Sequence, residues 1–440
     1  MESLKKRRIF IYSIVVTALL LVSTITYGLV RDDDPYKYFT GMGDQFEISP
    51  DDQYFLFSYY VDGKEGLYRA NVDGSDVQQI TRSDTARHHA PKYSRDGTKI
   101  LFLSKNADRL NALYVANADG SQQKRLTSNN IHVSEAVFSD TGDTVYYIGE
   151  PAENLKKSEG EMTEGSYVYS IHINGENSEK LTTEDYFFMN SLAISADGKT
   201  LFYSLFDGQK DKVTSFSLEN NEEKDTTITD VLPNESYHYQ LSPSEDKWAY
   251  TAVTEESKNS SLYKYELFIM DIEQRQSTRM THLNTSVVAP RFFNHKNQIA
   301  FLEYTNWAND PAENALYIVD LGTEDLQPVE LALSTQSSNH WFIKGVNQLV
   351  NGTTIAVLYM LLLGLLITYL QQYHSKRKSY VPVIASLVLS VLVCIASVAV
   401  AMMVDSWYGI GVGVLAIALL GCTVIVFGYA LVLNFVVKRD

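Results

Sequence analysis

The chain has 440 residues, of which 53 are acidic and 37 basic, and its net charge of −16 excludes ordinary binding to nucleic acid, whose phosphates would repel it. Hydrophobic residues make up 45% of the chain, and they are concentrated in four long runs near its two ends. This uneven distribution excludes a single soluble globule and predicts a membrane-integral protein with one large polar domain.

The first predicted element is a transmembrane helix over residues 9–30, which follows a basic cytoplasmic N-terminus at residues 1–8. The run contains no charged residue, and its length suits a hydrocarbon core of about 30 Å. A cleaved signal peptide is the alternative. Its apolar core would be shorter, about 7–15 residues, and would end at a small-residue cleavage site that this run lacks. We therefore favour an uncleaved anchor.

Residues 31–348 form the predicted large domain, in which one pattern recurs. Each copy ends an apolar strand at an anchor residue, passes through a tight turn and starts an aromatic strand, as in Tyr93-Ser-Arg-Asp-Gly-Thr-Lys-Ile-Leu-Phe102. The anchors are Ser49, Ser94, Ser139, Ser195, Ser242 and Phe293. A period near 40–50 residues with four short strands per unit is typical of propeller blades. The fold class predicted here is an all-β six-bladed propeller with α-helical transmembrane segments, one N-terminal and three C-terminal.

Two further features recur within the copies. A second tight turn, such as Asp119-Gly120-Ser121, precedes a short fourth strand, and glycine in such turns supplies a positive φ. The fourth strands end in threonine at Thr81, Thr127, Thr182 and Thr281. The fourth strand of the last blade has two candidates, residues 38–40 and residues 329–331.

The segment Ala90-Pro-Lys-Tyr-Ser-Arg-Asp-Gly-Thr-Lys-Ile100 closely resembles the WD40-like (PD40) repeat of TolB and of the prolyl oligopeptidase propeller. Over residues 36–333 the six copies resemble the six-bladed propeller of TolB, which implies the fold. The fifth and sixth copies depart from the pattern, because residues 244–246 and 294–296 replace the Asp-Gly turn. TolB is a soluble periplasmic protein, so its partners are not expected to transfer to this chain.

Three more transmembrane helices are predicted after the propeller. The segments are 349–371, 381–404 and 410–437, with a basic cytoplasmic loop at 372–380, a short outer loop at 405–409 and a cytoplasmic tail at 438–440. Lysine and arginine cluster before the first helix, between the second and third, and after the fourth. By the positive-inside rule, the chain is a multi-pass protein of a cell membrane with residues 31–348 extracytoplasmic.

Small residues in the last helix raise the question of a helix partner. Gly409 and Gly413 have the spacing that lets a second helix approach closely, either in another protein or within the three-helix unit, and packing within the unit is favoured. Both cysteines, Cys394 and Cys422, lie in apolar helices. An exported domain without cysteine fits a bacterial cell envelope.

Seven residues form the predicted binding face. All of them precede the first strands of four copies, so that ring symmetry would gather them around one mouth of the channel: His88, His89, His132, Phe188, Tyr237, His238 and Tyr239. Aromatic side chains there offer large contact areas with polar edges, which suits binding of an unknown envelope protein, a peptide or a glycan. The alternative is that several of them are buried between blades.

No metal, cofactor or catalytic residue is predicted. The histidines lack zinc-binding spacing, and each Asp-Gly turn offers too few oxygen ligands for calcium. The Gly-x-Ser-x-Gly elbow of the prolyl oligopeptidase hydrolase domain does not occur. A binding, scaffold or sensor protein of the bacterial envelope is therefore expected, with an envelope hydrolase acting at the channel mouth as the alternative.

Overall fold

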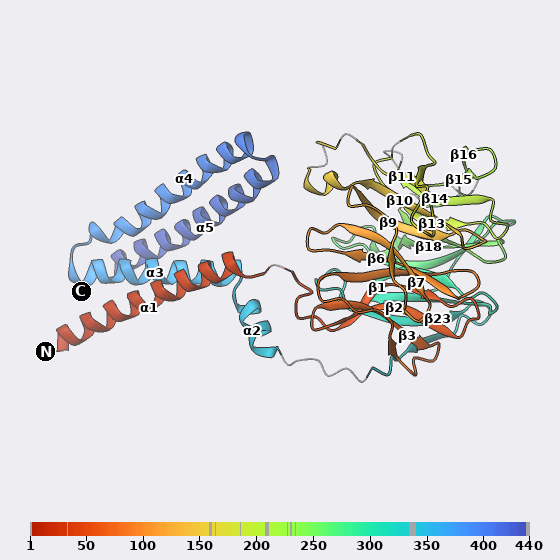
Figure 1. The fold of residues 1–440 in the computed structure, drawn as a ribbon. Helices are drawn as coiled ribbons and strands as arrows, with labels where there is room; N and C mark the ends of the chain where they lie inside the picture. The colour runs from red at the N-terminus through yellow and green to blue at the C-terminus, as the bar shows by residue number, and fades with distance from the viewer. Residues whose placement is uncertain are drawn as a thin grey trace. The chain divides into compact units, whose positions relative to one another are not determined.

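The computed structural model describes residues 2–32, 34–157, 161–162, 164–184, 186–206, 211–226, 228, 231–233, 235–333 and 340–436. Its contacts divide the chain into two units. One unit, Asp34–Ser338, is built of strands, and the other, Met1–Asp33 with Asn339–Asp440, is built of helices (Figure 1).

The described strands follow one another in groups of four, which we number 1 to 6, and neighbours within a group pair antiparallel in sequence order. Groups 1 to 3 contain β1 Gly41–Ile48, β2 Tyr54–Val61, β3 Lys64–Asn71, β4 Gln78–Gln79; β5 Arg87–Tyr93, β6 Lys99–Lys105, β7 Asn111–Asn117, β8 Lys124–Arg125; β9 Ile131–Phe138, β10 Thr144–Pro151, β11 Tyr167–His172 and β12 Glu179–Lys180. Groups 4 to 6 contain β13 Met189–Ile194, β14 Thr200–Phe206, β15 Asp211–Ser217, β16 Glu222–Asp225; β17 Ser236–Leu241, β18 Lys247–Val253, β19 Tyr265–Asp271, β20 Gln276–Arg279; β21 Ser286–Phe292, β22 Gln298–Tyr304, β23 Asn314–Asp320 and β24 Leu326–Val329. Short 3-10 helices lie at Ala152–Lys156 and Glu255–Ser257.

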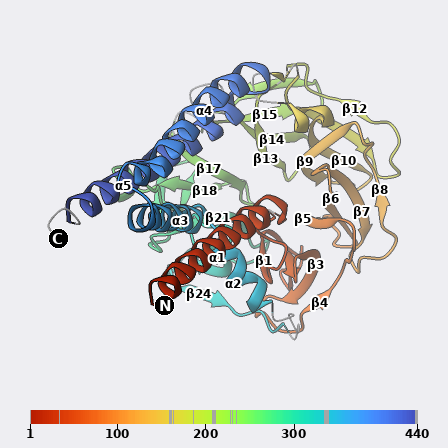
Figure 2. The same cartoon turned by 90° about the vertical axis from the view of Figure 1, so that its left-hand side faces the viewer.

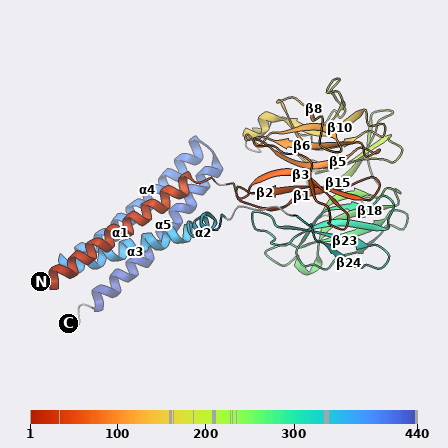
Figure 3. The same cartoon turned by 60° about the horizontal axis from the view of Figure 1, so that its bottom comes forward.

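The groups surround a common centre (Figures 2 and 3). Each first strand lies beside the first strand of the next group, and β1 of group 1 lies beside β21 of group 6. A hydrophobic cluster fills each junction between neighbouring groups. Each group therefore buries its two apolar faces against its neighbours and has no separate core.

The repeated anchor serine is explained by hydrogen bonds within the turn. The hydroxyl of Ser94 donates to Asp96 Oδ1 at 2.6 Å and accepts from the backbone N–H of Lys99 at 2.9 Å. Ser49 and Ser195 have equivalent bonds. Gly97 in the same turn has a φ of 69°, a conformation that favours glycine.

The repeated threonine has an equally local role. In four groups its hydroxyl accepts a hydrogen bond from a backbone N–H of the third strand, fourteen residues earlier, at 2.9–3.1 Å. The four pairs are Thr81 with Leu67, Thr127 with Leu113, Thr182 with Val168, and Thr281 with Leu267. The threonine thus satisfies a buried donor that the short fourth strand leaves unpaired.

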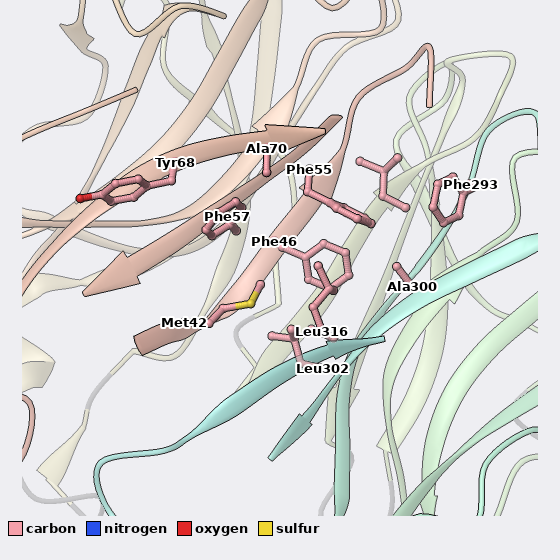
Figure 4. Packing of buried hydrophobic residues seen from close by; sticks show 12 residues of the cluster. Met42, Phe46, Phe55, Phe57, Tyr68, Ala70, Phe293, Ala300, Leu302 and Leu316 are labelled. Carbon is pink, nitrogen blue, oxygen red and sulfur yellow. The ribbon is translucent and has the colours of Figure 1, made fainter. Parts of the chain in front are cut away.

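We call the junction between groups 6 and 1 the seam. Its hydrophobic cluster includes Phe46 and Phe55 of group 1 and Phe293 of group 6 (Figure 4). The buried carboxylate of Asp52 accepts bonds from the backbone N–H groups of Asn294 and His295, each at 2.7 Å. The fourth strand of group 6 is β24, which pairs with β23 and shares only Val329 with the candidate at residues 329–331, whereas residues 38–40 form no strand.

The described residues of the second unit form five α-helices: α1 Glu2–Val30, α2 Trp341–Leu349, α3 Gly352–Tyr373, α4 Val381–Met403 and α5 Ser406–Val436, with a 3-10 turn at Lys378–Tyr380. Four stretches are long and apolar enough to cross a membrane: 4–30, 352–373, 378–403 and 406–435. The basic residues before position 9 already belong to α1, and α5 takes up most of the expected loop at 405–409. Helix α2 was not expected.

The glycines of α5 pack within the helical unit. The Ser397 hydroxyl of α4 donates to the carbonyl of Gly409 at 2.8 Å, and a Cβ added at Gly409 would lie 2.3 Å from that of Ala401. A Cβ at Gly413 would lie 3.0 Å from Ser397 Oγ. The close approach that these glycines allow is therefore used by α4.

Candidate binding site at the centre of the strand groups

Two cavities, each of about 520 Å³, lie at the centre of the strand groups. One, the turn-side cavity, is lined by the anchor turns. The other, which we call the mouth cavity, is lined by the starts of first strands and by loops of groups 5 and 6. Both cavities share the lining residues Lys92, Leu192, Gln240 and Arg291, so they meet at this level.

Ion pairs occupy the level where the cavities meet. Glu47 lies 2.6 Å from Lys92 Nζ and 3.7 Å from Arg291 Nε. Burial alone would raise the pKa of Glu47, but the two cations lower it below its usual value, so the carboxylate stays charged. Arg291 also donates to Gln240 at 3.3 Å. The cations at the base of the mouth cavity are thus already paired.

The wall of the mouth cavity is aromatic. The ring of Tyr265 meets Tyr237 edge-to-face with centroids 5.8 Å apart, and Trp307 meets Tyr265 at 5.9 Å and Tyr304 at 5.1 Å. The indole N–H of Trp307 donates to the Tyr263 carbonyl at 2.7 Å, which fixes the ring. Edge-to-face contacts of this kind hold the rings in a rigid wall.

The cavity also carries acidic groups from groups 1 and 6. Asp44 and Asp310 are exposed and line it, and within the described residues neither carboxylate has a hydrogen bond or a salt bridge. Between them Tyr36 accepts a bond from the Ala312 N–H at 3.1 Å. Burial raises the pKa of Tyr36, and the charges of Asp44 and Asp310 act in the same direction. The lining carboxylates that have no ion-pair partner among the described residues therefore give this cavity a negative charge.

A buried carboxyl group lies behind Asp44. Burial, and after it the charge of Asp44, raises the pKa of Glu65 to about 8. The carboxyl group is therefore largely protonated at neutral pH. A Cβ added at Gly43 would lie 3.1 Å from Glu65 Oε1 and 1.9 Å from Ser58 Oγ, so this glycine leaves room for both side chains.

Three of the seven predicted residues line the mouth cavity: Tyr237, His238 and Tyr239. Tyr237 is 38% exposed, whereas Tyr239 is 4% exposed and its hydroxyl bonds Ser236. His238 has its accessible surface toward the cavity and bonds Thr251 through Nδ1 at 3.0 Å. Removal from bulk water, and then the charge of Arg291, lowers its pKa.

The other four predicted residues do not line this cavity. His88 is a packing residue, because it is 5% exposed, bonds Thr81 and lies 4.8 Å from the Phe102 ring. His89 and His132 both bond Asn111, at 3.2 Å each. Phe188 is 54% exposed and lies outside the cavity lining.

A β-bulge lies in the first strand of four groups, close to the predicted positions. In groups 2, 4, 5 and 6 the pairing of the first strand skips a residue that has a positive φ: Ala90, Ser191, His238 and Ala289. A bulge bends the strand and redirects the side chains beside it. No motif in the sequence marks these positions.

The sequence also gave no warning of four wall residues: Tyr36, Tyr265, Tyr304 and Trp307. They belong to the link before β1, the start of β19, the end of β22 and the loop after β22, which are outside the segments that precede first strands. The signal that was available is the loop at 305–313, which is rich in polar residues and shares no pattern with other copies. Among the residues that the structure describes, no three His, Cys, Asp or Glu side chains are grouped as metal ligands.

The antiparallel four-stranded groups around one centre are those of a β-propeller. The sequence profile of the prolyl oligopeptidase N-terminal β-propeller domain matches residues 76–304, slightly more than half of the chain. The chain therefore belongs to this family, which confirms the predicted propeller fold. Comparison with curated proteins gives no match.

Among solved structures, the chain is similar to TolB from Acinetobacter baumannii, with 15% identity, a TM-score of 0.48, and coverage of 69% of this chain and 66% of that chain. A puromycin-hydrolyzing peptidase from Mycobacterium tuberculosis shows 10% identity, a TM-score of 0.46, and coverage of 69% and 54%. An oligogalacturonate lyase in complex with manganese shows 12% identity, a TM-score of 0.42, and coverage of 63% and 90%. The chain thus spans just under two thirds of that TolB and about half of the peptidase.

Proposed function

We propose that this chain is a membrane-anchored, six-bladed propeller of the bacterial cell envelope that binds an extracytoplasmic partner at its mouth cavity. Each of the six strand groups is one blade, and the seam closes the ring. The four apolar helices hold the propeller at the membrane, with both termini in the cytoplasm. This arrangement is supported by the contact of β1 with β21 and by the positions of the basic clusters.

The aromatic wall is the observation that carries the binding function. Its rings come from groups 5 and 6 and from the link before β1, and each is at least partly accessible in the cavity, apart from the buried Tyr239. Rigid tyrosine and tryptophan side chains bind ligands with little loss of side-chain entropy, and they dominate the energy of many interfaces. Such a wall favours binding of a peptide or glycan segment over hydrolysis.

The proposed topology is tested with reporter fusions to the full chain. A fusion after residue 340 is expected outside the cytoplasm, and a fusion after residue 378 inside it. The same report from both positions, or the opposite pair, would contradict four crossings. A fusion at residue 440 provides the matched control, because both termini are expected in the cytoplasm.

The binding face is tested by recovering partners from native membranes. Tyr237→Ala and Trp307→Ala are expected to abolish recovery without a large change in melting temperature, since both side chains are partly exposed. Phe188→Ala is the matched control, because it removes an exposed aromatic ring outside the cavity. Equal recovery by all three variants would show that the mouth cavity is not the binding face.

A further inference from the structure

We propose that the mouth cavity recognises a positively charged side chain, arginine or lysine, on an extended peptide segment of its partner. This inference rests on the proposed binding function and specifies the chemistry of the ligand. The juxtaposition that carries it is an aromatic wall beside two carboxylates, Asp44 and Asp310, that have no salt bridge within the described residues.

The charges of the cavity favour a cation. Its two basic lining residues, Lys92 and Arg291, are paired with Glu47. The third carboxylate of the lining, Glu135, accepts bonds from the backbone N–H groups of Ser191 and Leu192 at 2.9 and 2.8 Å. Asp44 and Asp310 are therefore the charged lining residues that have no ion-pair partner among the described residues. A ligand cation would supply that partner.

The rings beside these carboxylates would strengthen the same selection. A guanidinium or ammonium group is attracted to the face of tyrosine and tryptophan rings. The chain already contains this arrangement next to the cavity. Arg87 forms an ion pair with Asp34, and its guanidinium carbon lies 5.9 Å from the Tyr36 ring centroid and 5.6 Å from that of Tyr60. Tyr36 also lines the mouth cavity, close to Asp44 and Asp310.

The size of the cavity and its bulged walls favour a peptide as the carrier of this cation. A volume of about 520 Å³ exceeds what one ammonium or guanidinium group fills. The bulge at His238 takes this residue out of the strand pairing, and an unpaired bulge residue leaves main-chain groups available for hydrogen bonds. An extended peptide offers complementary main-chain groups together with a side chain that reaches the carboxylates.

The test uses the full chain in nanodiscs of phosphatidylglycerol, which has no amine. Three pools of acetylated, amidated heptapeptides are passed over the immobilised nanodiscs, with arginine, its neutral isostere citrulline, or glutamate at the central position. We expect the arginine pool to be retained about tenfold more strongly than the citrulline pool. Asp310→Asn should reduce this ratio toward one without changing retention of the citrulline pool.

A matched control keeps the result specific. Asp108→Asn removes an exposed carboxylate from the loop of group 2 that corresponds to the loop carrying Asp310, and it should behave as wild type. Asp310 is preferred over Asp44 for the first variant because the charge of Asp44 also acts on Glu65. Melting temperatures of all variants show that each chain is folded.

The other outcomes separate the two proposals. Equal retention of the arginine and citrulline pools, with both lost in Trp307→Ala, would refute recognition of a cation but would agree with the proposed binding function. No retention of any pool, together with unchanged partner recovery by Tyr237→Ala, would refute both the recognition of a cation and the proposed binding function. If added phosphatidylethanolamine displaces the arginine pool from wild type but not from Asp310→Asn, the cation that the cavity binds is the amine of a lipid headgroup. That outcome would refute a peptide as the ligand.

Discussion

Groups 1 to 4 and groups 5 and 6 of the propeller differ in how closely they follow the repeat. Groups 1 to 4 have discrete four-stranded sheets. Groups 5 and 6 share one sheet and supply most of the aromatic wall, including Tyr265 and Trp307. The difference teaches that the repeated residues specify the scaffold, whereas the departures from the repeat mark the candidate site.

The largest expected effect separates packing from binding within group 5. Tyr239→Ala should lower the free energy of unfolding by about 3–5 kcal/mol, because it empties a buried ring position. Tyr237→Ala should change it by less than about 1 kcal/mol, since that ring is partly exposed. Thermal unfolding of the purified protein measures both. Similar losses of unfolding free energy in the two variants would contradict the assignment of Tyr239 to the core and of Tyr237 to the cavity wall.

The second prediction tests whether the regular and irregular parts close into one ring. Asp52→Asn should lower the free energy of unfolding by about 1.5–3 kcal/mol, because the charged acceptor for the Asn294 and His295 N–H groups is lost. Asp76→Asn is the control, since Asp76 also has a positive φ but is exposed. An unchanged melting curve for Asp52→Asn would refute the role of this carboxylate at the seam.

The third prediction concerns the edge of the cavity that group 1 provides. The pKa of Glu65 is raised in the folded state, so the folded chain binds more protons than the unfolded chain at intermediate pH. Its contribution to stability is therefore complete below about pH 4.5 and is lost as the pH rises through about 8. Glu65→Gln should flatten the fall in melting temperature over this range. Parallel pH profiles for the two proteins would count against a protonated Glu65.

The smallest expected effect concerns the hydrogen bond from a third-strand N–H to the repeated threonine, which group 5 shares with groups 1 to 3. Thr127→Val and Thr281→Val should each cost about 1–2 kcal/mol, because each leaves a buried N–H without its acceptor. Thr226→Val should cost less, since the Thr226 hydroxyl donates to a carbonyl that the Thr226 N–H also bonds. A much smaller loss of unfolding free energy at Thr281 than at Thr127 would show that this hydrogen bond contributes less to stability in group 5 than in group 2.

The scaffold could be predicted from sequence because its determinants are local. Ser94, Asp96 and Gly97 act within a single turn, and Thr127 acts on the strand fourteen residues before it. Such contacts repeat whenever the residues repeat. The propeller fold and the four apolar helices were therefore predictable.

The site was only partly predictable, because its residues come together through long-range geometry. Tyr237 and His238 were found from their position before a first strand, but the same rule also selected His88, which is buried. Trp307 lies in a loop without a motif, and its approach to Tyr265 depends on the sheet that groups 5 and 6 share. Bulges at single residues such as Ser191 interrupt the pairing of first strands, and no sequence motif marks them.

The seam also has a mechanical meaning. Every other pair of neighbouring groups is joined by the polypeptide itself, whereas groups 6 and 1 are held only by side-chain packing and by hydrogen bonds such as those of Asp52. The two chain ends that lead to the helices leave from these same two groups, at Tyr36 and Leu333. In the proposed membrane-anchored ring, a pulling force between the two chain ends would therefore reach the junction that has no covalent link. We expect this junction to open under tension before any strand is unravelled, because packing and hydrogen bonds join groups 6 and 1 there.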